Sequence, residues 1–123
     1  MQAKRLARRI AEESYGKFAF DIELLDVRRR CEFSNYFLIL SGKNKTHLDS
    51  LFDFILDFAK ENKAGVYGRD GKSGSGWMVI DFGDLIVHIF MPETRRFYDL
   101  NSIWGDAKKV DLELEKPVKP ETK

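Results

Sequence analysis

Hydrophobic positions dominate the stretch between Trp77 and Phe90, where two apolar runs flank the dipeptide Gly83-Asp84. A two-residue connection that begins with glycine is typical of the primed turns that join antiparallel strands, because their twist matches that of the strands. The pattern therefore predicts a β-hairpin closed at this dipeptide. Its facing pairs are Phe82/Leu85, Ile80/Val87 and Met78/Ile89 on one face, and Asp81/Ile86, Val79/His88 and Trp77/Phe90 on the other.

The two faces of this predicted hairpin differ in chemistry. One is purely apolar, whereas the other combines Trp77 and Phe90 with the Asp81 carboxylate and the His88 imidazole, and is the candidate working face. Asp81 and His88 become diagonal neighbours within hydrogen-bonding reach. A base with its orienting group would also need a nucleophile, and the sequence places no serine or cysteine beside them. We therefore interpret the pair as structural rather than catalytic.

Hydrophobic periodicity predicts the remaining elements. Thr46 is the predicted N-cap of a long helix, with Asp49 in the capping-box position. A strand, a helix and a later strand of one sheet imply a right-handed crossover, so the strand before this helix should lie parallel to one after it. In chain order we expect a helix at 2–14, strands at 22–27 and 36–40, the long helix at 46–62, a short strand at 66–67, the hairpin, a short helix at 93–97 and one more turn at 99–104.

This order of elements predicts an α/β fold with a mixed sheet of four or five strands and packed helices. A chain of 123 residues fits a single domain, which we place at residues 1–106. Residues 107–123 are rich in Lys, Glu and Pro, which predicts a flexible C-terminal tail. The period-two spacing of Val110, Leu112 and Leu114 leaves open an edge strand in that segment.

Charge and cysteine content narrow the classes of function. The formal net charge is +1, so any RNA contact must be local, and the three consecutive arginines at 28–30 are the candidate. Asp49, Asp53 and Asp57 line one side of the long helix and face either solvent or a basic partner. Cys31 is the single cysteine, which excludes an internal disulfide and the usual zinc clusters. No apolar run is long enough for a membrane span, and we expect a cytoplasmic protein.

An ordered set of motifs carries a resemblance to a known family. From residue 20 to residue 106 the chain resembles the ribosomal silencing factor family, also called the Iojap family. Asn35 stands where that family usually has Asp, and Asp70 where it usually has Glu. The matching positions are Leu25-Asp26-Val27, Ser34-Asn35-Tyr36-Phe37, Ser41-Gly42, Trp77, Asp81, Gly83-Asp84, Val87-His88, Phe90, Tyr98, Leu100 and Trp104.

The resemblance implies a nucleotidyltransferase-like fold without that activity, and a role in translation. Family members dock on the large ribosomal subunit at ribosomal protein fourteen, block joining of the small subunit, and so repress initiation when nutrients are scarce. A role in large-subunit maturation and a homodimer in the free state are also implied. The partner-binding residues expected on this basis are Trp77, Asp81, His88, Phe90, Tyr98, Leu100 and Trp104.

Two alternatives from other classes remain open: a degenerate nucleotidyltransferase-like enzyme and an RNA-binding assembly factor. The first would need an Asp-x-Asp pair on one strand to hold Mg²⁺, and the chain has none. The triplet Gly71-Lys72-Ser73 lacks the first glycine of a phosphate loop, since Val66 stands there, and it precedes a strand instead of a helix. We therefore expect no catalytic residues, no metal and no cofactor.

Overall fold

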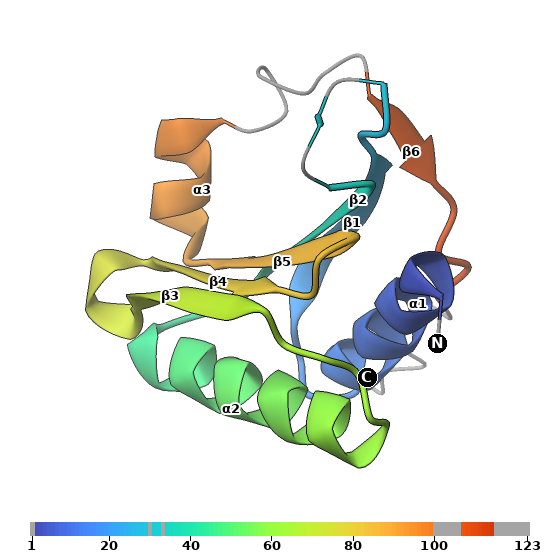
Figure 1. Cartoon of the computed structure of the whole chain (residues 1–123). Helices are drawn as coiled ribbons and strands as arrows, with labels where there is room; N and C mark the ends of the chain where they lie inside the picture. The colour runs from blue at the N-terminus through green and yellow to red at the C-terminus, as the bar shows by residue number, and fades with distance from the viewer. Residues whose placement is uncertain (1, 30, 33, 100–106, 115–123) are drawn as a thin grey trace.

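A six-stranded mixed sheet organises the chain, with strand order β3-β4-β5-β2-β1-β6. The computed structural model describes residues 2–29, 31–32, 34–99 and 107–114. Helices α1 and α2 pack against one face of the sheet, whereas α3 lies on the other side (Figure 1). The described elements are α1 (Ala3–Tyr15), β1 (Phe20–Asp26), β2 (Tyr36–Ser41), α2 (Lys45–Glu61), β3 (Gly68–Lys72), the 3-10 helix η1 (Ser73–Ser75), β4 (Trp77–Asp81), β5 (Leu85–Phe90), α3 (Pro92–Tyr98) and β6 (Lys108–Val110).

The predicted α/β fold, hairpin register and parallel crossover are confirmed. Strands β4 and β5 pair antiparallel with Ile80 opposite Val87 and Trp77 opposite Phe90. Gly83 has φ +89°, a backbone conformation that glycine adopts without steric cost. Strand β2 runs parallel to β5, as expected for a right-handed connection through α2. The sheet has six strands where four or five were expected, because β3 and β6 add an edge on each side.

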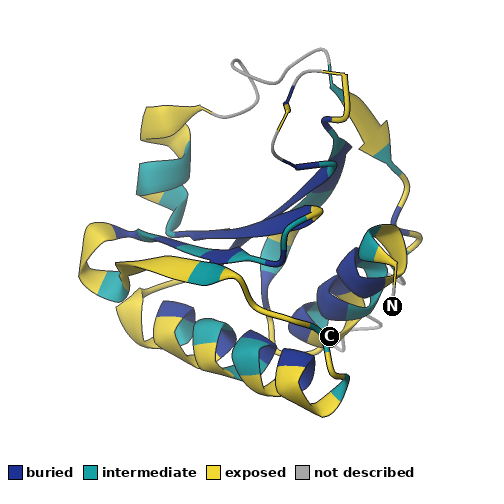
Figure 2. Ribbon diagram, in the orientation of Figure 1, coloured by how far each residue is buried: buried dark blue, intermediate teal, exposed yellow. Residues whose placement is uncertain are grey.

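Each face of the sheet buries its own apolar cluster, including the face for which the sequence predicted a mixed aromatic and polar surface. The face under α1 and α2 contains the apolar hairpin residues together with Leu38 and Leu40 of β2 and Leu51 and Ile55 of α2. The opposite face contains a smaller cluster that includes Phe90. Figure 2 shows the buried residues concentrated in the central strands and on the inner sides of α1 and α2, whereas β3 is largely exposed.

Two local predictions about the ends of elements are wrong. Asn44 and not Thr46 is the N-cap of α2, because its side chain accepts the His47 backbone N–H at 2.9 Å. The strand expected at 66–67 lies instead at 68–72. Gly71 has φ +89°, and a Cβ there would lie 2.2 Å from the Trp77 carbonyl oxygen, so this strand depends on glycine, a residue that argues against strand in a sequence pattern.

Residues 107–114 differ from the flexible tail expected at 107–123, whereas residues 115–123 lie outside the described residues. Residues 108–110 form β6, which pairs antiparallel with Leu24, Leu25 and Asp26 of β1. Leu112 is 9% exposed and belongs to the cluster under α1 and α2. The alternating apolar residues of this segment, Val110, Leu112 and Leu114, pack in or against the core, which outweighs the polar composition around them.

Candidate functional site

An aromatic cluster occupies the sheet face on the side of α3, and Trp77 lies at its centre. The Trp77 indole stacks on Phe90 at 4.9 Å between ring centroids and meets Tyr98 of α3 at 4.7 Å. His88 lies 5.9 Å from Trp77 and 4.9 Å from Phe37 of β2. We define the aromatic cluster as these five residues. It exists because β4, β5 and β2 each direct alternate side chains to the same face.

His88 is buried and hydrogen-bonded to tryptophan, not to Asp81 as the diagonal placement had suggested. The Trp77 indole N–H donates to His88 Nδ1 at 3.2 Å. A nitrogen that accepts carries no proton, so the neutral ring holds its proton on Nε2, and that nitrogen has no hydrogen-bond partner in the described structure. Burial lowers the pKa of His88 from 6.5 to about 4. The imidazole therefore positions the indole in its neutral form.

Asp81 stabilises the hairpin turn. Its Oδ1 accepts the Gly83 backbone N–H at 2.7 Å, a contact between a side chain and the backbone two residues on that is typical of aspartate at turns. The carboxylate is half-buried at the end of β4. With its oxygen engaged at the turn and His88 engaged with Trp77, the two groups do not form the base and orienter of a catalytic pair.

Only part of the predicted partner-binding set reaches the surface. Trp77 and Asp81 are half-buried and Tyr98 is 44% exposed, whereas Phe90 is fully buried and His88 is 8% exposed. Phe90 and His88 therefore support the aromatic cluster from below instead of presenting side chains to a partner. The predicted site residues Leu100 and Trp104 lie outside the described residues.

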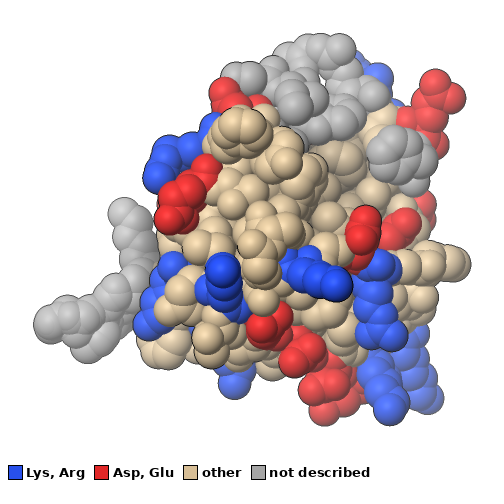
Figure 3. Space-filling view, turned by 90° about the vertical axis from the view of Figure 1, so that its left-hand side faces the viewer, with Lys and Arg blue, Asp and Glu red and all other residues tan. Residues whose placement is uncertain are grey.

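Phe97, which was not among the predicted site residues, is 79% exposed next to Tyr98, with the two rings edge-to-face at 5.1 Å. We call Trp77, Phe97 and Tyr98 the exposed aromatic surface. Figure 3 looks onto the side of the molecule formed by α3 and η1, and uncharged side chains fill the centre of that view between acidic and basic groups. The signal for Phe97 was its position on a seven-residue helix without buried residues, where an apolar side chain has no core to join.

Two of the charged candidates, Arg28 and Asp49, are engaged within the chain. Arg28 forms an ion pair with Asp26 at 2.6 Å and lies over the Tyr36 ring, and this arginine lowers the pKa of the Asp26 carboxyl through its side-chain hydrogen bond. On α2, Asp49 accepts a hydrogen bond from the Ser73 hydroxyl at 3.0 Å. Arg28 is thus less available to an RNA phosphate than the sequence pattern suggests.

The described part of the chain has neither a candidate metal site nor a helix that could span a membrane. It contains no group of three or more His, Cys, Asp or Glu side chains placed to hold a metal ion. None of its helices is both long enough and apolar enough to cross a lipid bilayer.

Comparison with known proteins confirms the family predicted from the motifs. A family model described as "Ribosomal silencing factor during starvation" matches residues 1–123. The ribosomal silencing factor of Bacillus subtilis (strain 168) is 33% identical over 114 residues, which cover 93% of this chain and 97% of that protein. The mouse protein named "Mitochondrial assembly of ribosomal large subunit protein 1" is 32% identical over 89 residues. The match covers 70% of this chain and 39% of the length of the mouse protein.

The fold has a counterpart among solved structures. A crystal structure of a protein from Chromobacterium violaceum superimposes with a TM-score of 0.81 at 21% identity, covering 96% of this chain and 98% of that one. This likeness concerns the fold, and it covers nearly the whole chain. The chain belongs to the ribosomal silencing factor family.

Proposed function

We propose that this protein docks on the large ribosomal subunit at ribosomal protein fourteen and blocks joining of the small subunit, which represses the initiation of translation. A second role in maturation of the large subunit is part of the proposal, because the mouse relative is named for assembly of that subunit. The protein acts as a steric block in the cytoplasm and carries out no catalysis in this role.

The observation that carries the proposal is the exposed aromatic surface. Aromatic side chains at a protein surface are over-represented among the residues that dominate binding energy. Phe97 and Tyr98 project from α3, and Trp77 joins them to the sheet through its contact with Phe90. The surface is thus held by the core on one side and open to a partner on the other.

Co-sedimentation with isolated large subunits tests the docking. We expect Phe97→Ala to weaken association by roughly 2 kcal/mol, about thirtyfold in Kd, as is typical when a binding hot spot is truncated. Phe18→Ala is the matched control, because Phe18 is 83% exposed and lies in the connection between α1 and β1, away from this surface. Equal affinities for the two variants would contradict the assignment of the surface.

Light scattering of mixed subunits tests the steric block. The wild-type protein should lower the yield of joined ribosomes in proportion to its occupancy of the large subunit, and Phe97→Ala should need a correspondingly higher concentration. Binding without any effect on joining would overturn the mechanism while leaving the partner intact. The implied homodimer would compete for the same surface, so sedimentation velocity of the free protein should show less dimer for Phe97→Ala than for Phe18→Ala.

A further inference from the structure

One carboxylate on β1 pairs with both elements that flank residues 100–106. Glu23 Oε1 lies 3.5 Å from Arg95 Nη2 of α3, and Glu23 Oε2 lies 3.4 Å from Lys109 Nζ of β6. Because each oxygen serves a different cation, the two ion pairs form at the same time. Helix α3, which carries Phe97 and Tyr98, and strand β6 are thereby joined through a single side chain of the central sheet.

The contact with α3 is the more enclosed of the two. The side chains of Arg95 and Glu23 are 16% and 24% exposed, whereas Lys109 is 68% exposed. An ion pair shielded from water keeps more of its attraction than one at the surface. No described residue of α3 is buried, so this helix is held by side-chain contacts with the sheet, such as this ion pair and the packing of Tyr98 on Trp77.

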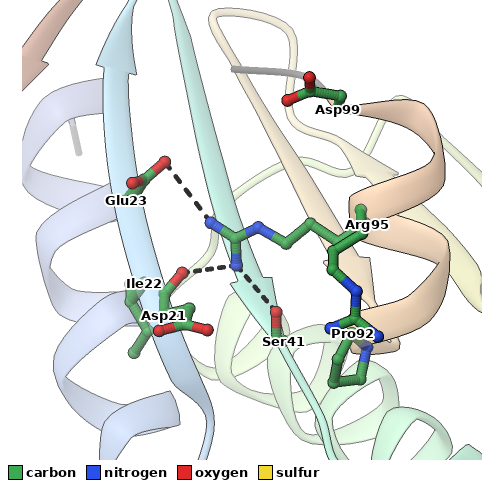
Figure 4. A pocket seen from close by; sticks show the side chains of 8 residues that line it. Asp21, Ile22, Glu23, Ser41, Pro92, Arg95 and Asp99 are labelled. Carbon is green, nitrogen blue, oxygen red and sulfur yellow. Dashed lines mark hydrogen bonds and ion pairs between the residues drawn. The ribbon is translucent and has the colours of Figure 1, made fainter. Parts of the chain in front are cut away.

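The sheet provides a fixed receptor for the Arg95 guanidinium. Nη1 donates to the Asp21 carbonyl oxygen at 2.6 Å and to Ser41 Oγ at 2.8 Å, and Figure 4 shows the side chain extending from α3 over β2 toward β1. Asp21 has φ +50°, an unusual value for a residue other than glycine, at the irregular pairing between Phe20 and Glu23. This irregularity places the Asp21 carbonyl and the Glu23 carboxylate on the same guanidinium.

We propose that Glu23 is a positioning residue for the exposed aromatic surface: its carboxylate fixes α3 and β6 together against β1. Removing its charge loosens both elements without detaching them, because Arg95 keeps its hydrogen bonds to the sheet and β6 keeps its backbone pairing with β1. Phe97 and Tyr98 are then held less firmly in the arrangement that a partner requires. The consequence for ribosome binding rests on the proposed function, whereas the mechanical coupling of α3 to β6 does not.

Hydrogen exchange of backbone amides tests the coupling directly. In Glu23→Gln, the amides of both α3 and β6 should exchange faster, by roughly threefold or more, while those of β3 and β4 stay unchanged. Lys109→Gln should accelerate exchange in β6 alone. Arg95→Lys should do so in α3 alone, since an ammonium cannot reproduce the contacts that the two guanidinium nitrogens make with Asp21, Ser41 and Glu23. The matched control is Glu61→Gln on the exposed end of α2, which should change neither.

The outcomes separate this proposal from the proposed function. If Glu23→Gln leaves the amides of α3 or β6 at wild-type exchange rates, Glu23 does not couple these two elements, whether or not the protein binds the large subunit. If both elements loosen and wild-type protein binds large subunits, Glu23→Gln should bind about tenfold more weakly per folded molecule, and equal binding would overturn the positioning role. If wild-type protein does not bind, the proposed function fails and the exchange pattern alone decides the coupling.

Discussion

The buried imidazole of His88 makes the stability of this protein depend on pH. In the folded protein its pKa falls to about 4 because the ring is buried, whereas in the unfolded chain it stays near 6.5. Between these two values the unfolded chain binds more protons than the folded one. The free energy of unfolding therefore rises with pH through this window, and the stabilisation present above pH 6.5 is lost as pH falls toward 4.

The size of the effect follows from the difference between the two pKa values. The full shift corresponds to about 3 kcal/mol, and between pH 7 and pH 4.5 about 2 kcal/mol of it should be lost. We expect His88→Gln to lack this component, because glutamine does not titrate and its side-chain oxygen can still accept the Trp77 indole N–H.

Urea denaturation at both pH values, followed by circular dichroism, measures the difference. The wild-type protein should lose about 2 kcal/mol more than His88→Gln on going from pH 7 to pH 4.5. His47→Gln is the matched control, since it removes the other histidine and should keep the wild-type loss. Equal losses in the wild-type protein and His88→Gln would show that His88 is not held neutral by burial, and would refute the reasoning.

Four other changes test the packing. Phe90→Ala should lower stability by about 3–5 kcal/mol in chemical denaturation, because the ring is fully buried. Asn44→Ala should cost about 1 kcal/mol in the same assay through loss of the α2 cap. Gly71→Ala should speed amide exchange throughout β3, since the new Cβ meets the Trp77 carbonyl. Deleting residues 108–123 should lower Tm by about 5 °C, and an unchanged Tm would show that β6 and Leu112 add nothing to the core.

The parts of the fold that could be predicted from the sequence are those set by apolar runs and a recognisable turn. The register between Trp77 and Phe90 followed from one turn and a period of two, because a shift by one residue would have exchanged the two faces of the hairpin. Strand β3 could not be found in this way, since it depends on backbone pairing and on Gly71 instead of on apolar side chains.

The sequence predicted which residues of the hairpin share the candidate site's face, but not how deeply each of them is buried. Alternation placed Trp77, His88 and Phe90 on one face, yet it carries no information on how far a helix such as α3 covers that face. The hydrogen bond of His88 to Trp77 instead of Asp81 depends on rotamers and on the competing turn N–H of Gly83, neither of which a sequence pattern contains. The ion pair of Glu23 with Arg95 could not be predicted from the sequence either, because the two residues are 72 positions apart and meet only in the fold.

The burial of His88 leaves its Nε2–H without a hydrogen-bond partner, which is a local cost in stability, and the contact of His88 with Trp77 explains why this residue is there. Its neighbours along β5, Val87 and Ile89, are apolar and fully buried, and an apolar residue in place of His88 would leave no unpaired Nε2–H beneath the surface. The imidazole instead accepts the Trp77 indole N–H, which fixes the tilt of the ring that contacts Tyr98. This arrangement fits the binding role proposed for the exposed aromatic surface, because departures from the most stable packing are expected at functional sites.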